Sequence, residues 1–167
     1  MKEIYILRHA KSSWDNINLA DFDRPLAKKG IDDAKKLCSF LKKHKFNAAK
    51  VICSNAKRAK ETFDLTADGF QFLIDDATYT DELYFGNIDT VIEKIKETEE
   101  ELKNILIVGH NPTLHLLVEN LIDESIQKFS TCNLAIISFK DKWKNLLPHK
   151  CKLKSLIRPK EIKFLKK

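Results

Sequence analysis

Three short apolar runs constrain the fold of this chain most. They read Ile-Tyr-Ile-Leu at 4–7, Val-Ile-Cys at 51–53 and Ile-Leu-Ile-Val at 105–108, and polar residues follow each run closely. Continuous apolar runs of this length are typical of parallel strands that are buried on both faces. Segments with helical apolar spacing alternate with these runs, for example over 27–44. We therefore expect an α/β fold: a three-layer sandwich with a mainly parallel mixed sheet and helices on both faces.

The remaining elements follow from periodicity and turn residues. We expect strands at 2–8, 50–54, 70–74, 104–109, 133–139 and 151–157, and helices over 27–44, 57–68, 88–98 and 112–122. Asn87 is the expected N-cap of the third helix, and 75–86 is an expected loop. The last two strands should form a hairpin-like unit that runs antiparallel at the edge of the sheet. No repeat or linker divides the chain, so we expect a single domain, 1–167.

Ionisable side chains follow each of the three apolar runs. Arg8 and His9 end the first run, Arg58 lies in the first turn of the helix after the second, and His110 follows the third. The carboxyl ends of parallel strands meet at one edge of a sheet, so these side chains should lie together. Guanidinium groups offer paired donors that match phosphoryl oxygens. The pattern therefore predicts a binding site for a phosphoryl group.

His9 is the candidate nucleophile in this site. Imidazole attacks phosphorus only when it is neutral, and the nearby charges of Arg8 and Arg58 disfavour its protonation. The same two arginines would stabilise charge on the oxygens during transfer, and His110 would donate a further hydrogen bond. A single histidine or arginine at such a position is more often structural or solvated. The occurrence of these residue types at all three strand-to-loop junctions is what favours a phosphoryl-binding site. No metal or cofactor is needed, because cationic side chains supply the charge.

The same segments resemble the histidine phosphatase superfamily, in the order that the family has them. They are Leu-Arg-His-Ala at 7–10, the serine-to-threonine segment 54–62, and Val-Gly-His-Asn-Pro at 108–112. The short chain and Asp-Arg-Pro-Leu at 23–26 are most similar to the small SixA-type phosphohistidine phosphatases. The resemblance implies that His9 accepts the phosphoryl group. The substrate-binding residues that it implies are Arg8, Arg58, His110, Arg24 and Asn111.

The resemblance also implies a proton donor, an acidic residue on a middle loop. Glu82 matches it best, which makes His9, Arg8, Arg58, His110 and Glu82 the implied catalytic residues. Asp81 is the rival donor, and an exposed carboxylate or a salt-bridge partner is the structural alternative for Glu82. Asp15 departs from the family, because it stands where the mutase branch carries Asn. A carboxylate cannot donate to phosphate, so this position counts against a phosphoglycerate mutase.

Three functions remain open at this point. The first is removal of phosphate from phosphohistidine on a protein. The chain lacks a long insertion between strands that could close over a bulky ligand, and a shallow, open pocket suits a phosphate that is carried on another protein. The second is hydrolysis of small phosphomonoesters or other small phosphate compounds. The third, less favoured, is a phosphate-binding module without catalysis, which the presence of both histidines and both arginines disfavours.

Composition narrows the setting of these functions. No signal peptide is recognisable and no apolar run approaches the ~20 residues of a membrane helix, so we expect a cytoplasmic protein without membrane contact. The four scattered cysteines form no CxxC pair, which favours reduced thiols over a metal site. Much of the net charge of +6 lies beyond Lys142 and is typical of a lysine-protected edge strand and tail. Nucleic acid is the less favoured partner, and we expect a monomer.

Overall fold

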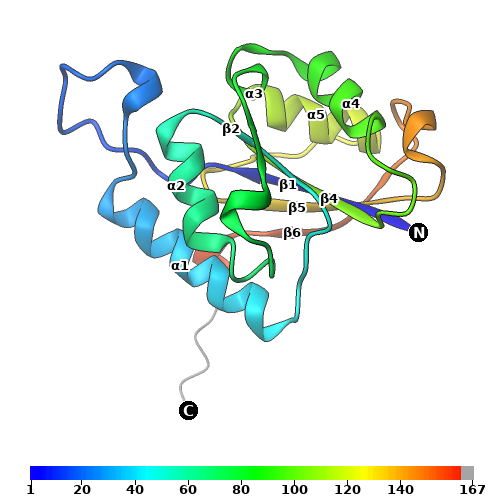
Figure 1. Cartoon of the computed structure of the whole chain (residues 1–167), viewed down its shortest axis with the longest axis horizontal. Coiled ribbons are helices and arrows are strands. Elements are labelled where there is room, and N and C mark those ends of the chain that lie inside the picture. Colours follow the sequence, from blue (N-terminus) through cyan, green and yellow to red (C-terminus); the bar gives the residue numbers. More distant parts are fainter. Residues whose placement is uncertain (163–167) are drawn as a thin grey trace.

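The computed structural model describes residues 1–162 and is built around a six-stranded sheet in the order β3-β2-β4-β1-β5-β6 (Figure 1). The strands are β1 (Lys2–Arg8), β2 (Val51–Ser54), β3 (Thr78–Thr80), β4 (Asn104–Gly109), β5 (Leu134–Phe139) and β6 (Lys152–Ile157). Strands β3, β2, β4 and β1 run parallel, whereas β5 runs antiparallel to both β1 and β6. The predicted mixed and mainly parallel sheet is confirmed.

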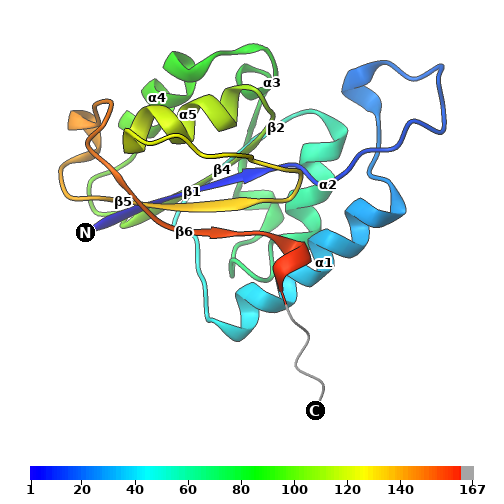
Figure 2. The same cartoon turned by 180° about the vertical axis from the view of Figure 1, so that it is seen from behind.

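Helices cover both faces of this sheet. They are α1 (Lys28–Lys43), α2 (Lys57–Thr66), α3 (Glu82–Phe85), α4 (Ile88–Lys96) and α5 (Thr113–Ile122). Figures 1 and 2 show α1 and α2 on one face and α4 and α5 on the other. In β1, Ile4 and Ile6 join the core with α4 and α5, whereas Tyr5 and Leu7 join the core with α1 and α2. Successive strand residues point to opposite faces, so the central strand is apolar throughout.

The segment after α2 differs from the prediction. Residues 70–74 do not form a strand: a turn ends at Gln71, an irregular stretch follows, and a short 3-10 helix begins at Ile74. The edge strand β3 comes later in the chain. The N–H of Phe70 donates to the carbonyl of Thr66, and Gln71 has a φ of 52°, which interrupts an extended backbone. Phe70 and Phe72 both pack on the core from this turn. Their alternation therefore imitates the pattern of a strand.

The stretch 75–86, expected to be a loop, contains both β3 and α3. Strand β3 has three residues and α3 is a single helical turn. Such short elements are stabilised by their neighbours, and no hydrophobic period develops over so few residues. The other helices and strands lie where they were predicted, within a few residues at each end. Asn87 caps α4 as expected, because its side-chain oxygen accepts the N–H of Thr90 at 3.1 Å.

Strands β5 and β6 form the predicted antiparallel unit at one edge of the sheet. Lys152 and Lys154 are exposed on the edge strand β6, where lysines oppose pairing with another chain. Lys163, Lys166 and Lys167 of the basic C-terminal segment lie outside the described residues. Within residues 1–162, no helix has the length and apolar character to cross a membrane.

Candidate active site

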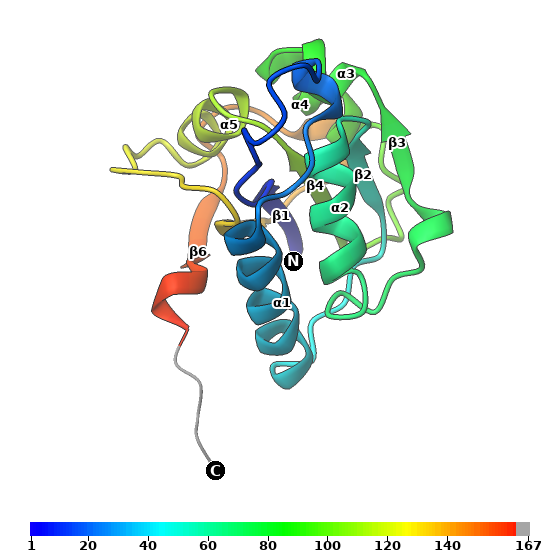
Figure 3. The same cartoon turned by 90° about the vertical axis from the view of Figure 1, so that its left-hand side faces the viewer.

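The carboxyl ends of β1, β2 and β4 bring the predicted ionisable side chains to one edge of the sheet. Arg8 is in register with Gly109 in the β1–β4 pair, so His9 and His110 leave neighbouring strands at the same level. The N–H of His9 donates to the carbonyl of Gly109 at 3.0 Å, and the two imidazole centroids are 5.1 Å apart. Figure 3 looks at this edge and shows the loop after β1 passing between α2 and α5.

A threonine ties helix α2 to this edge. The Thr62 hydroxyl donates to the carbonyl of Arg58 at 2.7 Å and accepts the N–H of Ala10 at 2.9 Å. Ala10 directly follows His9 and is fully buried, as is Thr62. The two bonds therefore fix the position of Arg58 relative to His9, and they explain why a threonine follows the arginine by one helical turn.

A pocket of about 340 Å³ opens at this edge. Its lining residues are Arg8, His9, Lys11, Ser12, Trp14, Arg24, Arg58, His110, Asn111 and Thr131. They include every substrate-binding residue predicted from the sequence. Four of the side chains are cationic, and no carboxylate is among the described residues that line the pocket. The charge suits a phosphoryl dianion.

His9 is buried, and a carbonyl group orients its ring. Nδ1 lies 2.7 Å from the carbonyl oxygen of Ala10. A carbonyl only accepts, so Nδ1 carries the proton of the neutral ring and Nε2 keeps its lone pair. Burial lowers the pKa of His9 to about 4, and the charges of Arg58 and Arg8 act in the same direction. The sequence argument invoked the charges, whereas burial is the larger cause.

His110 is held by a serine at the end of β2. Its Nε2 lies 2.8 Å from the Ser54 hydroxyl oxygen, which already accepts the N–H of Ala56 at 3.1 Å. The hydroxyl proton is thus available to Nε2, an arrangement in which the ring proton of neutral His110 is on Nδ1. That Nδ1 is buried and has no hydrogen-bond partner within residues 1–162. Burial, and then the neighbouring charges of His9 and Arg58, lower the pKa of His110 to about 3.

The lowered pKa values have a consequence that NMR can measure. We expect the ring signals of His9 to stay at their neutral positions from about pH 8 to pH 5 and to titrate near 4. An unfolded histidine titrates near 6.5, so below that pH the unfolded chain binds more protons. The stabilisation from neutral His9 is therefore present above about 6.5 and is lost as the pH falls towards 4. A midpoint for His9 near 6.5 would contradict this.

Arg8 and Asn111, which both line the pocket, donate hydrogen bonds to the same backbone carbonyl group. A terminal nitrogen of Arg8 donates to the Phe129 carbonyl at 3.3 Å, and its Nε is buried without a partner in the described part of the chain. The amide of Asn111 donates to the same carbonyl at 2.7 Å, and its oxygen accepts the N–H of His115 at 3.2 Å. Arg8 thus retains a donor without a partner, while the side-chain nitrogen and oxygen of Asn111 both form hydrogen bonds within the protein.

Asp21 is absent from the residues predicted above, yet it connects three side chains around the pocket. Its carboxylate accepts hydrogen bonds from Arg58 at 2.9 Å, Arg24 at 3.0 Å and the Tyr84 hydroxyl at 2.6 Å. The bond from Tyr84, and then those from Arg58 and Arg24, hold the pKa of Asp21 well below its usual range. An ionised carboxylate here orients both guanidinium groups. In the sequence, only the spacing of three residues between Asp21 and Arg24 indicates that these two side chains could pair.

The two candidate proton donors lie beside the pocket and do not line it. Glu82 pairs with Lys94 at 2.7 Å and is exposed, and Asp81 accepts the side-chain N–H of Asn55 at 2.9 Å. Tyr84 lies on the same short helix, α3, as Glu82. Its ring contacts His110 edge to face at a centroid distance of 5.4 Å, which places α3 next to the site. Each carboxylate is thus engaged with another side chain.

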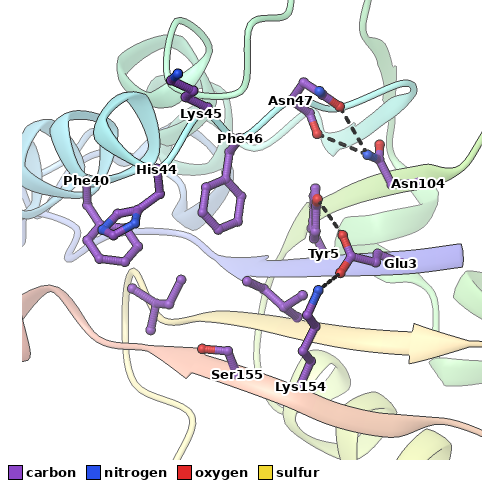
Figure 4. A pocket seen from close by; sticks show the side chains of 12 residues that line it. Glu3, Tyr5, Phe40, His44, Lys45, Phe46, Asn47, Asn104, Lys154 and Ser155 are labelled. Atoms are coloured by element: carbon purple, nitrogen blue, oxygen red, sulfur yellow. Dashed lines mark hydrogen bonds and ion pairs between the residues drawn. The ribbon is translucent and has the colours of Figure 1, made fainter. Parts of the chain in front are cut away.

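A second hollow, of about 510 Å³, lies near the start of β1 (Figure 4). The rings of Tyr5 and Phe46 border it with centroids 5.9 Å apart. Glu3 accepts the Tyr5 hydroxyl at 2.9 Å and pairs with Lys154 at 2.6 Å, so its carboxylate is already neutralised. No guanidinium is among the described residues that line this hollow. This hollow therefore lacks the paired guanidinium donors that the first pocket has.

Comparison with known proteins agrees with the geometry of that pocket. The model of the histidine phosphatase superfamily (branch 1) matches residues 4–102, which carry Arg8, His9, Arg24 and Arg58. The chain belongs to this superfamily. A histidine phosphatase fold is therefore established, and membership supports a phosphatase.

Several relatives align with most of this chain. A protein of Mycobacterium leprae without assigned function is 34% identical over 152 residues, which cover 84% of this chain and 91% of that one. The phosphohistidine phosphatase SixA of Escherichia coli is 24% identical over 138 residues, 81% of this chain and 84% of that protein. A structure of the protein histidine phosphatase SixA with tungstate has a TM-score of 0.83 at 23% identity and covers 96% and 99% of the two chains.

Proposed function

We propose that this histidine phosphatase is a metal-independent enzyme, in a single domain, that removes phosphate from phosphohistidine on proteins through a phosphorylated His9. One observation carries the proposal. Two neutral imidazoles lie 5.1 Å apart among arginines, in a pocket whose described lining residues include no carboxylate. Such a site stabilises a transferring phosphoryl group and offers its leaving group no carboxylic acid.

In the first step, Nε2 of His9 attacks the phosphorus. A new P–N bond forms as the P–N bond to the substrate imidazole breaks, and the substrate nitrogen takes its proton from solvent. Arg8, Arg58 and His110 all line the pocket, and their donors would stabilise the equatorial oxygens of the phosphoryl group. One phosphoramidate is exchanged for another, so this step is close to balanced in energy.

In the second step, water attacks the phosphorus of phosphorylated His9. The P–N bond breaks, inorganic phosphate leaves, and the imidazole returns to the neutral form with its proton on Nδ1. The Ala10 carbonyl holds the ring in that tautomer throughout, at 2.7 Å. The lowered pKa of His9 keeps the free enzyme ready for the next substrate at neutral pH.

The missing carboxylic acid favours phosphohistidine over alkyl esters. The alcohol of an alkyl phosphate leaves as an alkoxide unless a general acid protonates its oxygen. General acids typically contribute about 10²–10⁴-fold in rate. Glu82, the donor proposed from the family resemblance, lies outside the pocket lining and pairs with Lys94. The similarity to SixA, a phosphohistidine phosphatase in Escherichia coli, supports the same substrate class.

A substrate panel tests the proposal. We expect faster turnover of phosphohistidine protein than of simple alkyl phosphates, and Glu82→Gln should leave both rates nearly unchanged, because Glu82 lies outside the pocket lining. Glu93→Gln is the matched control, because Glu93 is another exposed glutamate paired with a lysine, at 3.4 Å from Lys96. Equal rates on the two substrates, with a loss on alkyl esters in Glu82→Gln but not in Glu93→Gln, would move the assignment to small phosphomonoesters. Turnover of neither would leave a phosphate-binding module.

Chelation is expected to leave the rate unchanged. The part of the chain that the structure describes contains no group of three or more His, Cys, Asp or Glu side chains that could hold a metal ion. The cationic pocket supplies the positive charge in place of a metal. Turnover of an aryl phosphate should therefore be equal with and without excess EDTA. A rate that is lost in EDTA and restored by a divalent ion would contradict the expectation.

A further inference from the structure

Large apolar side chains are exposed around the mouth of the catalytic pocket. Trp14, which lines the pocket, is 71% exposed, and Ile17 on the same loop is 89% exposed. Phe85 at the end of α3 is 77% exposed and Leu116 on α5 is 51% exposed. We refer to these four residues as the apolar rim. Figure 3 shows the three segments that carry them at the same edge of the sheet.

Contacts place Phe85 next to the catalytic groups. Its ring lies edge to face on Tyr84 at a centroid distance of 4.7 Å, and Tyr84 in turn contacts His110. The hydroxyl of Thr113, at the start of α5, lies 3.5 Å from the carbonyl of Gly86, so the end of α3 abuts α5. Phe85 therefore lies in the chain between a residue that contacts His110 and a residue that abuts α5.

Leu116 extends this apolar surface along α5. It lines a groove of about 460 Å³ together with Asn111, Pro112, His115 and Glu119. Asn111 also lines the catalytic pocket, so the groove and the pocket are neighbours on the surface. Exposed apolar patches that polar residues surround are typical of protein interaction sites.

We propose that the apolar rim docks a protein substrate whose phosphohistidine is flanked by apolar side chains. The proposal rests on the proposed function and names the surface that recognises the substrate. A histidine side chain is short, so its backbone must come to the pocket mouth when its phosphoryl group reaches Nε2 of His9. The neighbours of that histidine then lie against Phe85 and Leu116. A small phosphate compound has no such flanking residues.

Two synthetic peptides test the docking surface, each phosphorylated on a single central histidine. One carries leucines on both sides of the histidine and the other carries serines. We expect wild type to favour the leucine peptide by about tenfold in kcat/KM, which corresponds to burial of about one leucine side chain. The double variant Phe85→Ser/Leu116→Ser should lose this preference and retain wild-type turnover of free phosphohistidine.

The control is Leu73→Ser/Leu147→Ser, which removes two leucines of similar exposure, 70% and 53%, from segments that do not line the pocket. It should keep the preference. Equal wild-type rates on the two peptides, or a preference that survives in the rim variant, would overturn the docking proposal. So would hydrolysis of free phosphohistidine with no hydrolysis of either peptide, which would leave the chemistry intact. Failure on every phosphohistidine compound would overturn the proposed function and the docking with it.

Discussion

His9→Asn is expected to abolish turnover, with a loss of more than about 10³-fold in kcat, because the variant has no nucleophile at the phosphorus. The fold should survive, since the strand end is held by backbone bonds that do not involve this side chain. The N–H of His9 donates to Gly109, and its carbonyl accepts from Cys132 at 3.0 Å. The measurement is steady-state hydrolysis of an aryl phosphate and of phosphohistidine protein, with thermal unfolding to check folding.

His149→Asn is the matched control for this variant. It replaces an exposed histidine that pairs with Asp123 in the connection before β6. It should retain full activity. Near wild-type activity in folded His9→Asn would show that His9 is not the nucleophile.

Arg58→Ala is expected to cost on the order of 10²-fold or more in rate, as does removal of a donor that stabilises transition-state charge. Arg58→Lys should recover part of the loss, because it restores the charge without the paired donors. Lys60→Ala removes a charge two residues further along the same helix and should change little, because Lys60 does not line the pocket. Asp21→Asn should cost less than Arg58→Ala, since Asp21 acts only by orienting the guanidinium group.

Inorganic phosphate provides a second readout for these variants. A positioning role for Asp21 requires weaker inhibition by phosphate in Asp21→Asn, with an unchanged melting temperature. Weaker stability with unchanged phosphate inhibition would assign Asp21 to the fold alone. Full activity in folded Arg58→Ala would contradict the role of Arg58 in the anion site.

The strand ends of this site were predictable for a physical reason. Strands β1, β2 and β4 are buried on both faces, so their sequences are continuously apolar and their ends are abrupt. Parallel pairing then puts the residues that follow at one edge of the sheet. Arg8, His9, Arg58 and His110 are brought together by this rule, which needs no knowledge of the loops.

The loops were not predictable by the same rule. Asp21 and Tyr84 are 63 positions apart, and their 2.6 Å contact arises from the path of the loop after β1 rather than from any period in the sequence. The side chain of Glu82 turns towards Lys94, which a family motif cannot show. The order of causes for the pKa of His9 also depended on packing, because burial of a strand end cannot be ranked against nearby charges before the fold is known.

Trapping of the covalent intermediate tests the central claim most directly. Enzyme is mixed with excess phosphohistidine substrate, quenched within milliseconds in alkali, in which phosphohistidine is stable, and digested for mass spectrometry. The account predicts a phosphoryl group on the peptide that contains His9, attached to Nε2, and its absence in His9→Asn. An unmodified His9 throughout turnover, or a phosphoryl group on another residue, would contradict it.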